Sequence, residues 1–248
     1  MQKMFYRFKN FSTCVVCDRS FLSDGMRALL DDPEKYLQQA EARTIQDNFK
    51  NKIVYFEIDK KKAVIKIHKY KSAWHRIKRY FRQTRANRSW AYSLLFNAHG
   101  IPTPQPIAYK ESRIGPLRGD SYFIYEWVEG INGEEYFTKN KANPEIVEKA
   151  IDAIVDMTRT IKKLGLIHGD IRLKNMVFRG DDLLLTDFDD TKKRQWYKSN
   201  YMNNRDFRGL IEDIYYNVPP EIQPLFLSRL ESVGDDIRKL VRSYKHRP

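Results

Sequence analysis

Two aspartates and one asparagine stand close together in the polar segment "HGDIRLKNMVFRGDDLLLTDFDD". Asp170 and Asp187 are seventeen residues apart, and Asn175 lies between them. Between Asn175 and Asp187, "MVF", the turn "RGDD" and "LLLT" predict a β-hairpin, which brings these two residues to the same end. One amide oxygen and one carboxylate facing a common point suit Mg²⁺, which prefers hard oxygen ligands and keeps phosphate oxygens and waters as its others.

Asp170 lies a loop turn away from this predicted metal site. A carboxylate in such a place can accept the proton of an attacking hydroxyl, which is the role of the base in phosphoryl transfer. Taken singly, Asp170, Asn175 and Asp187 are equally compatible with loop caps or turn residues. Their combination, with a hairpin between them and a lysine on an upstream strand, favours the catalytic interpretation. His168 is interpreted as a structural residue that holds the loop backbone.

The upstream lysine is Lys66. "KIVYFEI" and "AVIKIHKY" are rich in β-branched and aromatic residues and are joined by the polar "DKKK", which predicts an antiparallel hairpin. In the second strand, Lys66 and His68 face one way while Ile65 and Ile67 face the other. An ammonium in mid-strand is costly unless it has a partner. The alternative is that Lys66 extends from a strand edge to solvent.

Further elements follow from periodicity and turn residues. "DDPEKYLQQA" predicts a short helix that opens at Pro33. "SAWHRIKRYFRQTRANRSWAYSLLFNAHG" predicts a helix that ends at Gly100. Its candidate buried residues are Trp74, Ile77, Phe81, Trp90, Leu94 and Leu95.

The second half of the chain is predicted to be mainly helical. "IPTPQPIAYK" must be extended because of its prolines, and "DSYFIYEWVEG" predicts a strand that ends in a hinge at Glu126 to Gly130. Pro144 opens an amphipathic helix that closes at Gly165. A short strand follows at Leu166 and Ile167, and the chain from residue 197 onward is predicted to be helical, with a break at "VPP".

The charge of the chain is strongly basic and unevenly distributed. The 248 residues carry a net charge of +13, and thirteen Lys and Arg lie between Asp59 and Glu111 without any acidic residue. So long a span without neutralising carboxylates indicates an anionic partner: phosphate, an acidic sugar, a lipid headgroup or nucleic acid.

The sequence shows no targeting or membrane-spanning signal. No segment approaches the roughly 20 apolar residues of a spanning helix, and the first twenty residues lack the apolar core of a signal peptide. We therefore expect a cytoplasmic chain that touches a membrane at most at its surface. Cys14 and Cys17, in "CVVC", are interpreted as ordinary reduced thiols because no second ligand pair stands nearby.

"HGD", four residues, "N" and then "DFD" resemble the catalytic and metal-binding loops of the protein-kinase-like superfamily. Within it, "TRANRSWAYSLLFNAHGIPTPQPIAY", "VIKIHKY" and "YFIYEWVEG" resemble the lipopolysaccharide kinase family, the Kdo and heptose kinases of the bacterial inner core. This similarity covers roughly residues 44–194.

The resemblance implies an α+β, bilobal, protein-kinase-like fold. Residues 1–41 would form an N-terminal extension, residues 42–128 an antiparallel-sheet, nucleotide-binding N-lobe, and residues 129–248 a mainly helical C-lobe with the catalytic loop, the metal site and the acceptor site.

The resemblance also implies roles for single residues. Lys66 would contact the α and β phosphates of ATP, and the backbone around Glu126 and Val128 would meet the adenine. In the C-lobe, the catalytic residues would be Asp170, as the base, and Arg172, as a partner of the transferring phosphoryl group. Asn175 and Asp187 would be the magnesium ligands.

The sequence departs from the protein-kinase pattern in three places. No glycine-rich loop precedes Lys66, and the helix after it contains no acid, so only Asn87 or Ser89 could orient the lysine from that helix, as neutral partners. Asp189 replaces the glycine after Asp-Phe. These departures argue against a regulated protein kinase and leave the predicted metal ligands intact.

The leading hypothesis is an ATP- and Mg²⁺-dependent kinase that phosphorylates a Kdo or heptose hydroxyl of the lipopolysaccharide inner core. It would act at the cytoplasmic face of the inner membrane, attached peripherally through its basic span to anionic lipid. One alternative is a small-molecule or atypical protein kinase of the same fold. Another is a non-catalytic binder of anionic lipid or nucleic acid; retention of all three polar residues speaks against it.

Overall fold

The chain divides into two compact units in the computed structural model, which describes residues 4–48, 51–68, 83–194 and 204–245. Unit 1 comprises Met1–Leu95 and Pro104–Trp127, and unit 2 comprises Phe96–Thr103 and Val128–Pro248. The backbone leaves unit 1 between Trp127 and Val128, within the segment predicted as a hinge. The described residues of the predicted N-terminal extension, 4–41, belong to unit 1.

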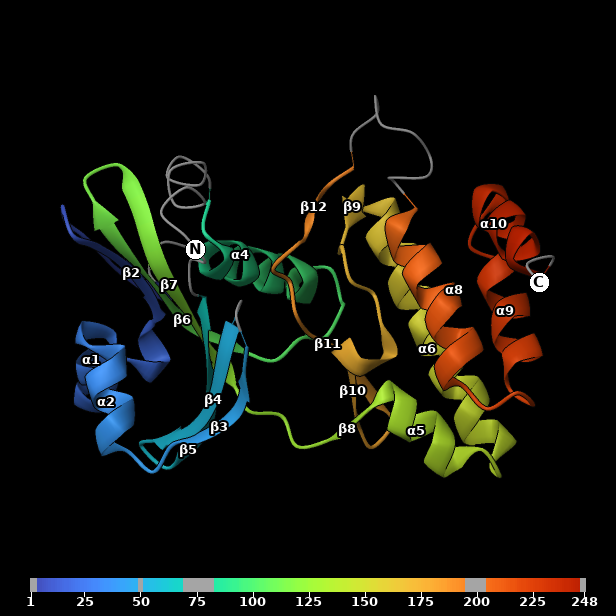
Figure 1. Cartoon of the computed structure of the whole chain (residues 1–248), viewed down its shortest axis with the longest axis horizontal. Helices are drawn as coiled ribbons and strands as arrows, with labels where there is room; N and C mark the ends of the chain where they lie inside the picture. The colour runs from blue at the N-terminus through green and yellow to red at the C-terminus, as the bar shows by residue number, and fades with distance from the viewer. Residues whose placement is uncertain (1–3, 49–50, 69–82, 195–203, 246–248) are drawn as a thin grey trace. The chain divides into compact units, whose positions relative to one another are not determined.

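Unit 1 is built on one antiparallel sheet with the strand order β1-β2-β6-β7-β5-β4-β3 (Figure 1). The strands that make up this sheet are β1 (Phe5–Lys9), β2 (Thr13–Asp18), β3 (Arg43–Asp47), β4 (Asn51–Ile58), β5 (Lys61–His68), β6 (Pro106–Ile114) and β7 (Leu117–Glu126). The order places β5, the strand of Lys66, between β4 and β7, so its backbone hydrogen-bonds on both sides.

The β4–β5 hairpin confirms the sequence prediction and refines its turn. Asp59 and Lys60 have φ of 50° and 63°, the left-handed pair that a two-residue hairpin turn requires. The lysines that follow, at 61 and 62, already belong to β5. The turn is therefore shorter than the predicted "DKKK" connection.

The segment before β3, for which the sequence predicted only one helix, also contains two strands and a second helix. A 3-10 turn (Arg19–Phe21) links β2 to α1 (Asp24–Asp31), and α2 (Pro33–Gln39) follows. The side chain of Ser23 caps α1 by accepting from the N–H of Met26 (3.0 Å). Asp32 caps α2 ahead of Pro33, as its sequence predicted.

The two faces of the sheet in unit 1 are covered by different helices. Ile65 and Ile67 pack with residues of α1 and α2 in one buried cluster. Phe123 and Tyr109 pack on the opposite face with Trp90 of α4 (Arg85–Ala98). Lys66 pairs with Phe123 across the sheet, which places it on the α4 face, as the alternation of β5 predicted.

Other predictions for this region had mixed outcomes. Trp90 is buried, Leu94 and Leu95 are only half-buried, and the fully buried residue near the end of α4 is Phe96, which the sequence interpretation omitted. Three further candidates lie outside the described residues: Trp74, Ile77 and Phe81.

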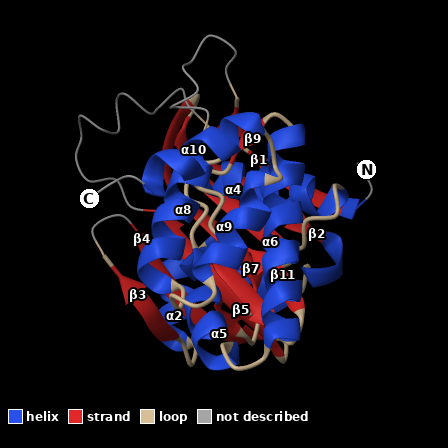
Figure 2. Cartoon of the chain, turned by 90° about the vertical axis from the view of Figure 1, so that its right-hand side faces the viewer, coloured by secondary structure: helices blue, strands red, loops and turns tan. Residues whose placement is uncertain are grey.

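Unit 2 is mainly helical, and its helices are drawn in blue in Figure 2. Its helices are α5 (Gly133–Asn140), α6 (Pro144–Lys163), α8 (Arg205–Asn217), α9 (Gln223–Glu231) and α10 (Asp235–Lys245). The predicted amphipathic helix is α6, which is capped by Asn143. Its buried residues form one stripe: Val147, Ala150, Ile151, Ile154, Val155, Met157, Thr158 and Ile161. The break between α8 and α9 falls at the predicted "VPP".

Two small sheets carry the polar loops of unit 2. In the first, β10 (Met176–Arg179) pairs with β11 (Asp182–Leu185) and with β8 (Ile131–Asn132). In the second, β9 (Leu166–Ile167) pairs with β12 (Lys192–Lys193). The short strand β9 is as predicted. The predicted β10–β11 hairpin is also present, but its turn is shorter than "RGDD", because Arg179 and Asp182 already belong to the strands. Among the described residues, no helix is long and apolar enough to cross a membrane.

Candidate functional site

The loop that carries Asp170 is anchored by an aspartate far away in the sequence. Asp206, at the start of α8, accepts hydrogen bonds from the backbone N–H groups of His168 (2.6 Å) and Gly169 (2.7 Å). Seven residues later on the same helix, Asp213 accepts from the N–H of Leu173. Both aspartates are buried. They fix the backbone on either side of Asp170.

The sequence interpretation missed these two anchors. The signal was present, because Asp206 and Asp213 are two helical turns apart on the apolar face of α8, with Leu210 and Ile214. A carboxylate on a buried helix face must have donors, so that pattern indicates a polar contact inside the fold.

Gly169 is required by the path of this loop. Its φ is +97°, and a Cβ atom at this position would lie 2.9 Å from the carbonyl oxygen of Asp190. The segment that follows Asp187 therefore runs directly against the loop of Asp170, and any larger residue at 169 would push the two apart.

Asp170 and Asn175 contact each other directly. The side-chain amide of Asn175 donates to the carboxylate and to the carbonyl oxygen of Asp170, both at 2.9 Å. The next residue, Met176, opens β10 opposite Leu185 of β11, and the N–H of Thr186 donates to the carbonyl oxygen of Asn175 (2.9 Å). The predicted hairpin thus brings Asn175 and Asp187 to the same end.

The Asp187 backbone adopts a left-handed conformation with φ of 64°, which is uncommon outside glycine. The next residue, Phe188, is buried, with its ring centroid 5.4 Å from both Phe96 and His168. Such a backbone persists only when the surrounding structure holds it, and it occurs often at functional sites. Asp189, which replaces the glycine of protein kinases, is buried as well.

Arg172 faces a small cavity beside Asp170. Its guanidinium lies 3.8 Å from Asp170, 3.6 Å from Glu212 and 3.7 Å from Asp213. The cavity has a volume of about 270 Å³, and its polar lining includes two further arginines, Arg205 and Arg208 of α8. Asp170 and Glu212 line the same cavity, and Arg205 lies 4.0 Å from Asp190, so a carboxylate or phosphate bound there would share the guanidinium groups with carboxylates of the protein.

His168 is fully buried between aromatic rings. Its Nε2 lies 3.1 Å from the carbonyl oxygen of Thr186, which makes Nε2 the protonated nitrogen of a neutral ring. Burial lowers the pKa of His168, against the opposite effect of the carboxylates of Asp206, Asp187 and Asp170. This supports the prediction that His168 is structural, because it cannot readily take up a proton.

This burial predicts an acid-sensitive contribution to stability. The unfolded chain protonates His168 below a pKa of about 6.5 while the folded chain resists it, so the free energy of unfolding falls as the pH drops through this value. We expect a loss of about 1.4 kcal/mol per pH unit from this group. Denaturant unfolding at neutral and acid pH should show that His168→Phe loses less unfolding free energy on acidification than the native chain does. An equal pH dependence in both chains would contradict the assignment.

The predicted nucleotide residues belong mainly to unit 1. Lys66 is 5% exposed on β5, opposite Ile53 of β4 and Phe123 of β7. Glu126 ends β7, and its N–H donates to the carbonyl oxygen of Gln105 (2.9 Å). Val128 is the residue at which the chain enters unit 2.

A buried acid in unit 1 was not foreseen either. Glu111 of β6 is fully buried and is an ion-pair partner of Arg113 (3.1 Å). It also accepts from the hydroxyl of Thr84. Tyr109, two residues before Glu111 on β6, is paired with Phe123, which is in turn paired with Lys66. Glu111 therefore lies on the same face of the sheet as Lys66. Asn87, expected as a possible neutral partner of Lys66, donates to the Tyr109 hydroxyl (3.0 Å).

Asn175 and Asp187 of unit 2 carry the kind of oxygen atoms that bind a divalent cation. The side-chain amide nitrogen of Asn175 donates to the carboxylate of Asp170, so the amide oxygen is the atom of this side chain that can bind a metal ion. That oxygen and the carboxylate of Asp187 are the hard donors that Mg²⁺ prefers, with phosphate oxygens completing its shell.

Comparisons with known proteins identify a family and a fold. Residues 35–244 match the family described as "Lipopolysaccharide kinase (Kdo/WaaP) family". The solved structure "WaaP in complex with acyl carrier protein" is similar with a TM-score of 0.62 and 17% identity, covering 89% of this chain and 91% of that one. The M. tuberculosis PknI kinase domain gives a TM-score of 0.49 at 14% identity, covering 81% and 92%. No curated protein matches the chain. The protein-kinase-like fold predicted from the sequence is confirmed.

Proposed function

The chain belongs to the lipopolysaccharide kinase (Kdo/WaaP) family, and we propose that it transfers the γ-phosphate of ATP to a Kdo or heptose hydroxyl of the lipopolysaccharide inner core. Membership makes it a phosphotransferase that uses ATP, usually with Mg²⁺. The observation that carries the proposal is the anchored loop of residues 168–175 beside a cavity bordered by arginines.

In this proposal the polar residues of the loop have the following tasks. Asp170 accepts the proton of the acceptor hydroxyl, and the amide of Asn175 holds the carboxylate in place. Arg172, close to Asp170, meets the transferring phosphoryl group. Asn175 and Asp187 hold Mg²⁺, which when bound neutralises charge on the β and γ phosphates.

The acceptor is proposed to be anionic because of the arginines around the cavity. Arg205 and Arg208 project from α8 toward the same cavity as Asp170. A carboxylate of Kdo or a neighbouring phosphate of the core would bind there while the sugar hydroxyl faces the base. The place of action that follows is the cytoplasmic face of the inner membrane, with peripheral attachment.

The test is transfer of labelled phosphate from ATP to purified lipopolysaccharide cores that end in Kdo or in heptose, with mass spectrometry of the product. We expect one added phosphate on one of the two cores. Transfer only to a soluble sugar or to a protein would replace this proposal by the small-molecule or atypical protein kinase. ATP binding without any transfer would favour the non-catalytic binder.

Arg205→Ala tests the acceptor site. Loss of one charge-assisted contact of about 1.5–3 kcal/mol should raise the KM for the core acceptor by roughly tenfold or more and leave the KM for ATP unchanged. Arg179→Ala is the matched control, because Arg179, the last residue of β10, forms an ion pair with the exposed Asp182, the first residue of β11. Equal acceptor kinetics in both variants would remove Arg205 from the site.

Lys66→Ala tests the nucleotide site. If Lys66 contacts the α and β phosphates, its removal should weaken ATP binding by roughly tenfold or more, as loss of a charge-assisted hydrogen bond predicts. Isothermal titration with a non-hydrolysable ATP analogue measures this directly. Lys62→Ala is the control, because Lys62 is an exposed lysine on the same strand. Unchanged nucleotide affinity in Lys66→Ala would contradict the assignment.

A further inference from the structure

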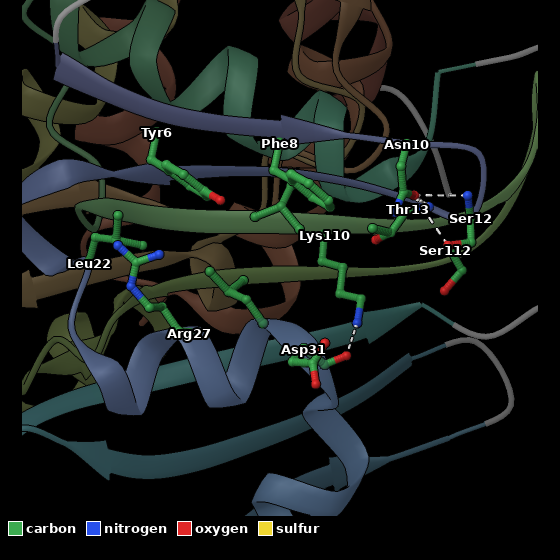
Figure 3. Close-up of a pocket in the computed structure, with 12 residues that line it drawn as sticks. Tyr6, Phe8, Asn10, Ser12, Thr13, Leu22, Arg27, Asp31, Lys110 and Ser112 are labelled. Atoms are coloured by element: carbon green, nitrogen blue, oxygen red, sulfur yellow. Dashed lines mark hydrogen bonds between the residues drawn. The ribbon is translucent and has the colours of Figure 1, made fainter.

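Cations border a cavity in each unit, and their surroundings differ. The cavity of unit 1, about 570 Å³, lies between β1, β2, β6 and α1 (Figure 3). There Arg27 lies over the ring of Tyr6, 5.5 Å from its centroid, and the Nζ of Lys110 donates to the carbonyl oxygen of Asp31. Both cations thus have partners within unit 1. In the cavity of unit 2, by contrast, Arg172 lies beside the proposed base.

Each nitrogen of the Arg172 guanidinium faces a carboxylate of a different residue. Its Nε lies 3.8 Å from Asp170, its Nη2 lies 3.6 Å from Glu212, and its Nη1 lies 3.7 Å from Asp213. These distances are longer than that of a direct hydrogen bond, so Arg172 is held mainly by charge. The three acids together therefore set the plane of the guanidinium.

Arg172 lies against α8 at a position where the helix has no side chain. A Cβ atom at Gly209 would lie 3.5 Å from the Nε of Arg172 and 3.8 Å from its Cζ. Glu212 and Asp213 follow Gly209 by three and four residues, which places them one helical turn further along the same side of α8. The guanidinium is thus close to the helix and beside both of its acids.

The Asp213 carboxylate also has a structural task. Its side chain is 5% exposed, one of its oxygens accepts from the N–H of Leu173, and the other accepts from the side-chain amide of Asn217 (2.7 Å). Removing this carboxylate would release the loop backbone together with Arg172. A variant at Asp213 would therefore mix two effects.

The Glu212 carboxylate links Arg172 to a different helix. Its Oε1 accepts from the hydroxyl of Tyr244 (2.9 Å), while its Oε2 is the atom that lies 3.6 Å from Arg172. Tyr244 belongs to α10 and is buried, whereas Glu212 borders the cavity. A buried tyrosine of α10 thus holds one oxygen of the carboxylate, and the other oxygen is turned toward the guanidinium.

We propose that Glu212 and Tyr244 are positioning residues for phosphoryl transfer: Tyr244 fixes the carboxylate of Glu212, and Glu212 orients the guanidinium of Arg172. The inference deepens the proposed function and rests on it, because the contact of Arg172 with the transferring phosphoryl group is part of that function. An arginine side chain is long and flexible, so it stabilises a transition state better when its orientation is set beforehand. Neither positioning residue needs to touch a substrate.

A different task for Glu212 would be to compete with an anionic acceptor for the cations of the cavity. The two tasks predict different kinetics for Glu212→Gln. Loss of orientation lowers kcat and leaves the KM for the core acceptor near its native value, whereas loss of competition lowers this KM and leaves kcat unchanged. The hydrogen bond from Tyr244 favours orientation, because an acid that only competed would not need a buried hydroxyl to hold it.

The experiment measures kcat and both KM values of the full chain with ATP, Mg²⁺ and the purified core. Arg172→Ala should lower kcat by roughly 10²- to 10³-fold, the usual effect of removing one transition-state donor. Glu212→Gln should lower kcat by about tenfold or more, because the guanidinium is kept but misplaced. Tyr244→Phe should lower kcat by about threefold or more, as expected for one lost hydrogen bond.

Two control variants make the same chemical changes elsewhere in unit 2. Glu148→Gln removes a Glu–Arg ion pair of equal length, since Glu148 lies 3.6 Å from Arg229 in an exposed place on α6. Tyr216→Phe removes the hydroxyl of a tyrosine of α8 that is 84% exposed. Both should keep the native kcat. Thermal unfolding of each variant ensures that the kinetics are those of folded protein.

The double variant Arg172→Ala/Glu212→Gln tests whether Glu212 acts through Arg172. If it does, adding Glu212→Gln to Arg172→Ala should change kcat by less than about twofold, because the group that it orients is already absent. A further tenfold loss in the double variant would show an independent effect of Glu212. That result, or a native kcat in Glu212→Gln, would overturn the proposal.

Nuclear magnetic resonance of the Arg172 guanidinium gives a readout that does not depend on kinase activity. Restricted rotation separates the Nη–H signals of an arginine, and the Arg172→Ala spectrum identifies those of Arg172. They should broaden or merge in Glu212→Gln and stay separate in Glu148→Gln. If they do so while the native chain transfers no phosphate, the kinase proposal fails and the orientation of Arg172 by Glu212 stands. Signals that are the same in Glu212→Gln and the native chain would overturn that orientation.

Discussion

Asp170→Asn is expected to reduce phosphate transfer to the core acceptor by roughly 10²- to 10⁴-fold, the usual contribution of a positioned general base. Asparagine keeps the size of the side chain but cannot accept the proton of the hydroxyl. It would also place an amide group against the amide nitrogen of Asn175, which now donates to the carboxylate at 2.9 Å. Single-turnover transfer from labelled ATP measures the effect on the chemical step.

Two comparisons make this result specific to the base. ATP affinity and thermal stability should change little, because the Asp170 side chain is 40% exposed and is not one of the proposed metal ligands. Asp182→Asn provides the control, since it makes the same change at an exposed position, the first residue of β11. Transfer by Asp170→Asn at the native rate would show that another group accepts the proton.

Asp206→Ala should cause the largest loss of stability. It leaves the N–H groups of His168 and Gly169 without their acceptor inside the fold, and each unsatisfied buried donor costs about 1–3 kcal/mol. The sum, roughly 2–6 kcal/mol, corresponds to a lower Tm by about 5–20 °C for a chain of this size. Burial raises the pKa of Asp206, and the same two N–H donors act in the opposite direction.

Loss of the Asp206 anchor should also lower activity below the temperature of unfolding, because Asp170 directly follows the two anchored residues. Thermal unfolding and transfer at low temperature measure the two effects separately. Asp152→Ala is the control, since Asp152 is an exposed aspartate whose ion pair with Arg229 lies on the surface of α6. A variant as stable as this control would show that the loop is held by other contacts.

The proposals for the two units differ in how they can be tested. Removing the Lys66 side chain should lower the affinity for ATP, whereas removing the Arg205 side chain should raise the KM for the core acceptor. Because the two readouts are independent, each assignment can fail without the other.

The sequence alone determined the elements whose signals are local. The β4–β5 hairpin follows from two apolar strands around a polar turn, α6 from an apolar stripe between Pro144 and Gly165, and the β10–β11 hairpin from a turn between two short apolar runs. Since Asn175 and Asp187 flank that last hairpin, their convergence was also predictable. The α2 helix was predictable from its Asp-Pro start.

Elements whose stability depends on partners distant in the sequence could not be predicted in this way. The strands β1 and β2 are short. β2 is stable because it pairs with β6, about a hundred residues away in the sequence, and β1 pairs only with β2 at the edge of the sheet. The turn residues of their hairpin, Asn10 and Ser12, were visible but did not indicate what the strands would pair with.

Only the tertiary structure decided how the catalytic loop is held and what surrounds it. Asp206 and Asp213 lie nearly forty residues from the backbone they bind, and Arg205 joins Asp170 at one cavity only because α8 packs beside the loop. Local patterns report the period of a strand or helix, but the partner of a buried polar group is set by packing. The sequence therefore determined which residues could do the chemistry, and the fold determined which residues keep them in place.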